Sequence, residues 1–260
     1  MLKTGWHLVM TTLLLVMALM LAGCGGGGGG EGALSSAATL GLAVNKTTVA
    51  SGTDTVTATV TLTSLNSQPV NGVSVTVDMT YNNAVVGSYS GNTNTNGIAA
   101  IVVPVALVPA DRTVYLQARS SGITSSSSLA VAVKAPVITV TLADASVTDV
   151  SGATFTGAGI NFADYNNNGL ANTTITFTYT SSSGSAGTLS HSGTPLAIGD
   201  SFNVTTDSSG YATIALAGSL NAMPPSGSSD TATFNYTVSV VYGAYTYTKQ
   251  GSVSVTVTSS

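Results

Sequence analysis

The stretch "DTVTATVTLT", residues 54–63, alternates apolar and polar residues without a break. It places Val56, Ala58, Val60 and Leu62 on one side and threonines on the other. Successive side chains of a strand point to opposite faces, so this pattern predicts a half-buried β-strand. The same alternation returns in "GVSVTVDM" (72–79), "SLAVAV" (128–133), "TTITFTYT" (173–180) and "SVSVTV" (252–257). Short alternating strands separated by Gly, Asn, Asp and Ser turns predict an all-β sandwich fold.

The strand pattern occurs twice along the chain. "SLNSQPVNGVSVTV", starting at Ser64, aligns with "DYNNNGLANTTITF", starting at Asp164. Further on, "NTNGIAAIVV" from Asn94 aligns with "DSSGYATIAL" from Asp207. The wider spacing of the second copy falls in the Ser/Gly-rich stretch 181–193, which predicts a longer loop between its middle strands.

A proline separates the two copies. Pro136 follows directly on the strand that ends near Lys134, and proline restricts both itself and the residue before it. The repeat therefore predicts two tandem domains, 34–134 and 135–260, joined by a short, stiff connection. The second domain, farther from the N-terminus, is the expected contact surface for a protein or glycan partner.

With these motifs the chain resembles the bacterial Ig-like domains of the invasin and intimin type, often called Big-1, over residues 37–258. The family pattern is a D-x-N-G-x-P-V turn, an alternating strand, and later T-D-x-x-G-x-A. Here the two copies read "LNSQPVNGVSVTV" with "TNTNGIAAI", and "DYNNNGLANTTITF" with "TTDSSGYATIAL". The first turn lacks the Asp, and Leu170 follows glycine without a proline. The resemblance implies antiparallel Ig-like sandwiches with surface or adhesion roles, and it implies no chemical site.

The N-terminus predicts export and lipid attachment. Residues 1–23 hold a positive start and the apolar run Leu8–Leu21, which is shorter than the roughly 20 residues that a membrane-spanning helix needs. Leu21-Ala22-Gly23-Cys24 resembles the bacterial lipobox, which implies a covalent lipid on Cys24. Two or more acyl chains hold a protein stably at a membrane.

The glycines after Cys24 predict a flexible tether over residues 24–33. Gly25, in place of Asp, resembles lipoproteins sorted to the outer membrane. We therefore expect a bacterial envelope lipoprotein that faces the periplasm or the cell surface, held to the membrane by its lipid.

Composition excludes several classes of function. Six Lys and Arg stand against ten Asp and Glu, so the formal net charge is −4 and no basic patch suits nucleic acid. With a single cysteine, Cys24, there is no disulfide, and stability must come from packing. A Ser-His-Asp arrangement could use His191 and Asp200, but no nucleophile elbow surrounds them. We expect no enzyme and interpret His191 as an exposed loop residue.

"DYNNNG" is the candidate ion site, because Asp164, Asn166 and Asn168 have the spacing of the first half of a calcium loop. Its twelfth position is Ile175, where an EF-hand places a bidentate Glu. The first copy forms the corresponding turn without a carboxylate. Asn and Asp favour such turns by bonding their own backbone, so the sequence favours a structural turn over a calcium site.

Three tyrosines near the last hairpin, Tyr242, Tyr245 and Tyr247, are candidates for partner binding. Tyr245 and Tyr247 share odd numbering with Val253 and the valines after it, so an unbroken strand points them inward. A bulge at Gly251 would turn them outward. This parity favours core or rim packing over recognition, and Tyr242, nearest the turn, is better placed for exposure.

Together these features predict a lipid-anchored, non-catalytic adhesion or spacer module with no cofactor. The alternatives are a calcium- or glycan-binding accessory protein, and a structural subunit of an envelope assembly.

Overall fold

The computed structural model describes residues 38–259 except 122, 126, 151 and 156. These residues form strands and turns with no helix, so the prediction of an all-β fold is confirmed. Within this range there is accordingly no helix long and apolar enough to cross a membrane. The predicted signal peptide (1–23) and tether (24–33) lie outside the described residues.

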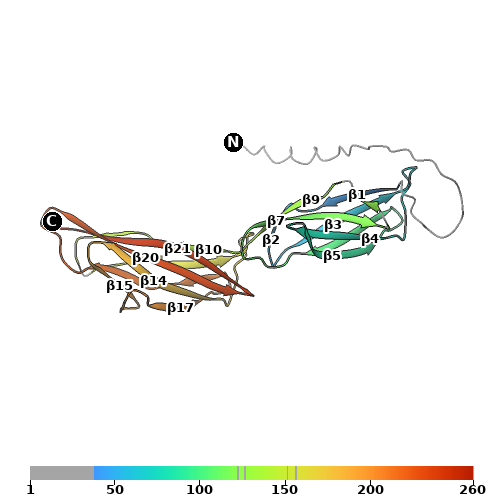
Figure 1. Ribbon diagram of the computed structural model, residues 1–260. Helices are drawn as coiled ribbons and strands as arrows, with labels where there is room; N and C mark the ends of the chain where they lie inside the picture. Colours follow the sequence, from blue (N-terminus) through green and yellow to red (C-terminus); the bar gives the residue numbers. More distant parts are fainter. Residues whose placement is uncertain (1–37, 122, 126, 151, 156, 260) are drawn as a thin grey trace, which may run out of the picture.

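The strands form two groups that lie end to end, as Figure 1 shows. In the first group one sheet has the order β1-β3-β6 and the other β2-β9-β7-β4-β5, with β8 added to β7. Only the β2–β9 pair is parallel in this group. The strands are β1 (Thr39–Val44), β2 (Thr48–Ala50), β3 (Thr55–Thr63), β4 (Ser74–Tyr81), β5 (Ala84–Asn92), β6 (Ile98–Pro104), β7 (Arg112–Ser120), β8 (Ile123–Thr124) and β9 (Leu129–Lys134).

The second group has three sheets, with the orders β10-β13-β18, β11-β21-β20-β14-β17 and β12-β19-β15-β16. Its parallel pair is β11–β21. The strands are β10 (Val137–Thr141), β11 (Ala145–Val147), β12 (Ala153–Thr154), β13 (Gly159–Ala163), β14 (Thr174–Gly184), β15 (Gly187–His191), β16 (Thr194–Leu196), β17 (Ser201–Thr205), β18 (Tyr211–Thr213), β19 (Leu216–Leu220), β20 (Ser229–Tyr242) and β21 (Tyr245–Thr258). In the described residues no sheet includes strands from both groups.

The alternating residues form the cores. Val56, Ala58, Val60 and Leu62 are all buried on β3, while the threonines between them are partly exposed. The second sandwich buries larger side chains, among them Phe162, Phe177 and Phe234. Full burial of such a side chain contributes about 1.5–3 kcal/mol. Since the described chain holds no disulfide, this packing stabilises both sandwiches.

The two repeated motifs meet in space at one end of each sandwich. In the first, Leu62 N–H donates to the Gly97 carbonyl and Val70 N–H to the Leu62 carbonyl. In the second, Phe162 N–H donates to Gly210 and Leu170 N–H to Phe162 in the same way. The glycines have φ values of 72° and 74°, which only glycine adopts readily. The sequence repeat is therefore a repeat of backbone hydrogen bonding.

The stretch 181–193 is not the longer loop that its composition predicts. Residues 181–184 extend β14, which pairs with β20 as far as Gly184↔Ala232, with a register shift near Tyr179. Residues 187–191 form β15, which pairs with β19 and β16. The extra residues thus build strands, because their backbone groups find partners on β20, β19 and β16.

Candidate functional site

Hydrogen bonds between the two sandwiches bring together the main candidate site of the described chain. We call it the junction: the segment 50–54 and residues 105–109 of the first sandwich, the turn 164–168 and the β20–β21 hairpin of the second, and the connection 134–137. It includes most of the residues that the sequence singles out. Cys24 lies outside the described residues, so its lipidation stays a prediction.

Asp164 is 3% exposed at the junction, and hydrogen-bond donors occupy both of its carboxylate oxygens. Oδ1 accepts the N–H groups of Asn166 (2.8 Å) and Asn168 (2.9 Å). Oδ2 accepts the Asn168 side-chain amide (3.0 Å) and the Thr53 hydroxyl (2.9 Å), the latter from the first sandwich. Burial of Asp164 opposes its ionisation, but these donors outweigh burial and lower its pKa.

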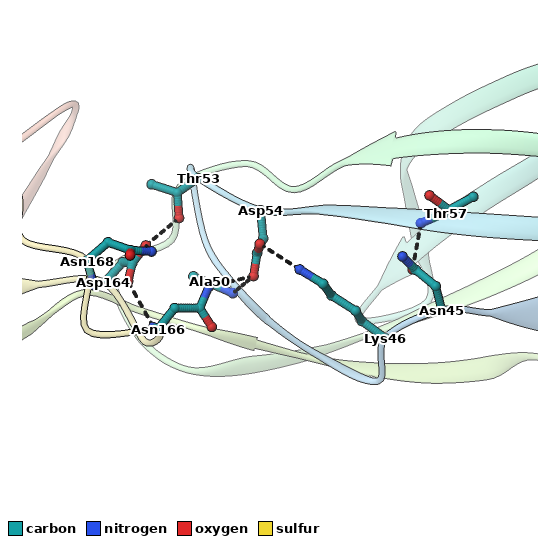
Figure 2. Close-up of polar contacts among 9 residues, drawn as sticks. All are labelled: Asn45, Lys46, Ala50, Thr53, Asp54, Thr57, Asp164, Asn166 and Asn168. Carbon is teal, nitrogen blue, oxygen red and sulfur yellow. Dashed lines mark hydrogen bonds and ion pairs between the residues drawn. The ribbon is translucent and has the colours of Figure 1, made fainter. Parts of the chain in front are cut away.

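The candidate ion ligands therefore serve other contacts. Asn166 donates from Nδ2 to Asp54 Oδ2 of the first sandwich at 2.9 Å, as Figure 2 shows, while Asn168 donates to Asp164. A calcium ion at this turn would have to displace those donors. Within residues 38–259, no group of three or more His, Cys, Asp and Glu side chains is placed to hold a metal.

The turn 64–68 of the first sandwich has the same backbone hydrogen bonds as the turn 164–168, but it has no carboxylate. Asp164 N–H donates to the Asn168 carbonyl and Asn167 N–H to the Asp164 carbonyl. In the first sandwich Ser64 N–H donates to Gln68 and Ser67 N–H to Ser64. Ser67 and Asn167 also share a positive φ, 57° and 62°. The backbone of this turn thus forms whether or not Asp is present, and the carboxylate adds a contact to the neighbouring sandwich.

Asp54 receives donors from both sandwiches. It accepts the Ala50 N–H at 3.0 Å, the Asn166 amide, and the Lys46 ammonium at 2.9 Å (Figure 2). These donors, the Ala50 N–H first, lower the Asp54 pKa to about 2. Asp54 is therefore ionised under all physiological conditions.

The three tyrosines also lie at the junction. Tyr247 is 6% exposed, and its hydroxyl donates to the Val108 carbonyl of the first sandwich at 2.8 Å. Burial, followed by the neighbouring Tyr245 and Tyr242, raises the Tyr247 pKa to about 12. The rings of Tyr242 and Tyr247 each lie 5.6 Å from Phe162.

The β20–β21 ladder explains this placement. Its register is continuous from Ser229↔Thr258 to Tyr242↔Tyr245 and pairs Tyr236 with Gly251 without a bulge. Tyr247 therefore points inward together with Val253, and it is not on a free surface. Tyr242 and Tyr245 are half-buried against the core, so any role in binding a separate partner stays a prediction for these two.

The connection itself is held by Asp111. Its carboxylate accepts the Ala135 N–H at 2.9 Å and the Lys134 ammonium at 2.7 Å. The Lys134 hydrogen bond first, and then the Ala135 N–H, lower the Asp111 pKa. Nothing in the sequence around Thr53, Asp54, Val108 and Asp111 indicates these contacts, because each joins residues far apart in the chain. Only the Pro136 junction could be identified in advance.

His191 is half-buried on β15 and is not the exposed loop residue that we expected. Its ring stacks on Phe202, with centroids 3.6 Å apart and planes 4° apart, and burial lowers its pKa. Asp200 uses its carboxylate to accept the Ala197 N–H at 2.8 Å. The two side chains therefore serve separate local contacts, His191 with Phe202 and Asp200 with the Ala197 N–H.

Comparisons with known proteins give structural similarities only. No family model matches the chain, and no curated protein matches it. Among solved structures, the D0-D1 domain of intimin matches at 18% identity and a TM-score of 0.31, covering 85% of this chain and all of that one. Invasin matches at 16% identity and a TM-score of 0.36, covering 85% of this chain and 40% of that one.

A third similar structure comprises domains 4 and 5 of the S-layer protein SbsC. It matches at 16% identity and a TM-score of 0.27, covering 85% of this chain and 98% of that one. The chain thus spans less than half of invasin but the full length of the intimin fragment. At these TM-scores the similarities support no inference about activity or partners.

Proposed function

We propose that this chain is a non-catalytic spacer or adhesion module of the bacterial cell envelope, attached by lipid at Cys24. In this proposal the two sandwiches act as a stiff stalk that holds the second sandwich away from the membrane. The observation that carries it is the junction, where direct contacts from four separate segments tie one sandwich to the other.

The contacts support stiffness because they restrain more than one direction. Thr53–Asp164 and Asp54–Asn166 join one pair of turns, and Tyr247–Val108 joins a hairpin to a different loop. Asp111 restrains the connection at Ala135. Two bodies joined only by a covalent linker would rotate freely, whereas contacts at separate points resist both bending and twisting.

Distance measurements between spin labels test stiffness. Labels at Asn66→Cys and Ser183→Cys would report across the junction, because these exposed residues lie at the ends of the two sandwiches that face away from it. Cys24→Ser in the same chain removes the native thiol. We expect one narrow distance distribution, and a broader one after Thr53→Val with Asn166→Ala. A distribution that is already broad in the parent would overturn the stalk.

Membrane attachment has its own test. The change Cys24→Ser should release the exported protein into the aqueous phase of a detergent partition, because it removes the thiol that would carry the lipid. Gly28→Ser, which leaves Leu21–Cys24 intact, is the matched control and should stay in the detergent phase. Retention of the Cys24→Ser variant in detergent would show that the anchor is elsewhere. Protease treatment of intact cells would then separate surface display from a periplasmic location.

The accessory-binder alternative can be tested through calcium. If Asp164, Asn166 and Asn168 bind it, a chelator should lower the melting temperature and a titration should give saturable heat. The occupied oxygens of Asp164 lead us to expect neither effect, and a saturable calcium response would favour the alternative.

A further inference from the structure

A polar pocket of about 470 Å³ lies on the first sandwich, at the end of the sheet nearest the junction. This volume is within the range of small-molecule sites in proteins. The pocket is built from the end of β4, the turn that follows it, and the start of β7. Its lining residues are Thr80, Tyr81, Asn82, Asn83, Asp111, Arg112, Thr113 and Tyr115.

Arg112 is the unusual member of this pocket. Its guanidinium lies 4.8 Å above the ring of Tyr81, and its Nε–H is buried with no acceptor. In the described part of the chain, ion pairs join Lys46, Arg119 and Lys134 to aspartates, but none joins Arg112. A guanidinium positioned over an aromatic ring, without a carboxylate of its own, is suited to a carboxylate brought by a ligand.

Asp111 precedes Arg112 in the chain, but its carboxylate is not the partner of the Arg112 guanidinium. Its two carboxylate oxygens accept from Lys134 and from the Ala135 N–H. The Lys134 ammonium also neutralises the negative charge of the Asp111 carboxylate. The cationic character of the pocket therefore comes from Arg112.

The rest of the lining indicates what kind of ligand carries the carboxylate. Asn82 and Asn83 both have positive φ, 49° and 61°, and form a tight turn between the paired residues Tyr81 and Ala84. The turn fixes the backbone of both residues, and their exposed side-chain amides can donate to or accept from hydroxyl groups. Tyr115, 46% exposed on the outer face of β7, offers an aromatic face. None of the lining residues is aliphatic.

We propose that this pocket binds a carboxylate-bearing saccharide of the uronic acid class. Arg112 takes the carboxylate with its terminal Nη groups, the Asn82–Asn83 turn takes ring hydroxyls, and Tyr115 packs against the sugar ring. A lipid acyl chain would need an aliphatic lining, which this pocket does not have. The pocket shares Asp111 with the connection. The proposed ligand contacts come from other residues, so either proposal can fail without the other.

Calorimetric titration of the full chain in detergent with digalacturonic acid tests the site. The neutral disaccharide of galactose and N-acetyl-triglycine, which offers a carboxylate without a sugar, are the comparison ligands. We expect saturable binding of digalacturonic acid, and at least tenfold weaker binding of both comparison ligands. Equal binding of the neutral sugar or of the peptide, or no saturable binding of digalacturonic acid, would overturn the proposal.

Variants locate the binding. Arg112→Met keeps an unbranched chain beside Tyr81 but removes the charge, and should weaken binding about tenfold or more. Arg119→Met, on the same strand and paired with Asp78 outside the pocket, should leave it unchanged. Should Arg112→Met fail to fold, Tyr115→Ala at an exposed position should still weaken binding severalfold. Unchanged affinity in the pocket variants, or equal loss in Arg119→Met, would place the ligand elsewhere.

Discussion

Asp54 connects three parts of the chain through one carboxylate: its own loop, Lys46 and the second sandwich. Its ordinary pKa of 3.8 falls to about 2 in the folded protein. A depressed carboxylate pKa stabilises the folded state above the unfolded pKa, and this contribution is lost as pH falls through the folded pKa.

We therefore expect Asp54→Asn to lower the free energy of unfolding by about 1–2 kcal/mol near pH 7, because the ionised acceptor is lost. The difference from the parent should shrink from about pH 4 downward and be lost as the pH falls through about 2. Chemical denaturation at several pH values measures it. Asp230→Asn, at the start of β20 away from the junction, is the control. A difference that stays constant down to pH 2 would contradict the assigned role.

Tyr247 makes a contact that depends on a single atom. Tyr247→Phe keeps the ring against Phe162 but leaves the Val108 carbonyl without its donor. An unsatisfied buried acceptor costs about 1–3 kcal/mol, so we expect a loss of stability in that range. Tyr165→Phe, at a side chain 47% exposed, should change stability little. Equal effects in the two variants would show that the Tyr247 hydroxyl contributes nothing specific.

The repeated motifs of each sandwich set the positions of its elements. Gly97 and Gly210 sit where the later motif meets the first turn, and an added Cβ would lie 2.5 Å from the Leu62 or Phe162 carbonyl oxygen. Neither contact can relax by rotation of a side chain, because the obstructing atoms belong to the backbone. The approach of the two motifs thus depends on these glycines.

Replacing Gly97 or Gly210 by Ala should therefore destabilise the chain by about 2–4 kcal/mol, from the positive φ and the clash together. Gly72 provides a matched control, since its φ is 73° and no atom lies within 4 Å of an added Cβ. Gly72→Ala should show the conformational cost alone, about 1 kcal/mol. Thermal unfolding compares the three variants. If all three lose the same stability, the close approach of the motifs is unimportant.

The elements differ in how well the sequence predicts them. The strand at 54–63 could be predicted because its period of two matches the pleat, and β3 spans Thr55–Thr63. The stretch 181–193 could not, since its serines and glycines favour a loop locally while pairing with distant strands makes it extended. His191 was misplaced for the same reason: its burial comes from Phe202 on another strand.

At the scale of the whole molecule, the junction was the least predictable feature. The turn at Asp164 could be identified from its Asp and Asn residues, but its use of Thr53 and Asp54 depends on how two separate sandwiches dock. The parity of the last strand predicts an inward Tyr247, but it does not predict that the Tyr247 hydroxyl contacts the neighbouring sandwich of its own chain. Local patterns predict turns and strands, whereas contacts between distant segments leave no periodic signal.

Separating the sandwiches tests their independence. In the described residues each sheet lies wholly on one side of 135–136, so we expect residues 34–134 and 136–260 to fold when expressed apart. The second fragment should be less stable than in the whole chain, because Tyr247 and Asp164 lose their partners. Circular dichroism and thermal unfolding of each fragment and of the whole chain measure this. An unfolded fragment beside a cooperative whole would mean that the chain is a single folding unit.

The two parallel strand pairs give the molecule a preferred response to mechanical tension. β2 runs alongside β9 in the first sandwich, and β11 alongside β21 in the second. When the chain is pulled from its two ends, β2 is drawn toward the N-terminus and β9 toward the C-terminus, so the strands must slide past one another. Sliding loads every hydrogen bond of the ladder at once, whereas peeling would break them one at a time. β11 and β21 are loaded in the same sense, so each sandwich meets a pulling force with its bonds acting together.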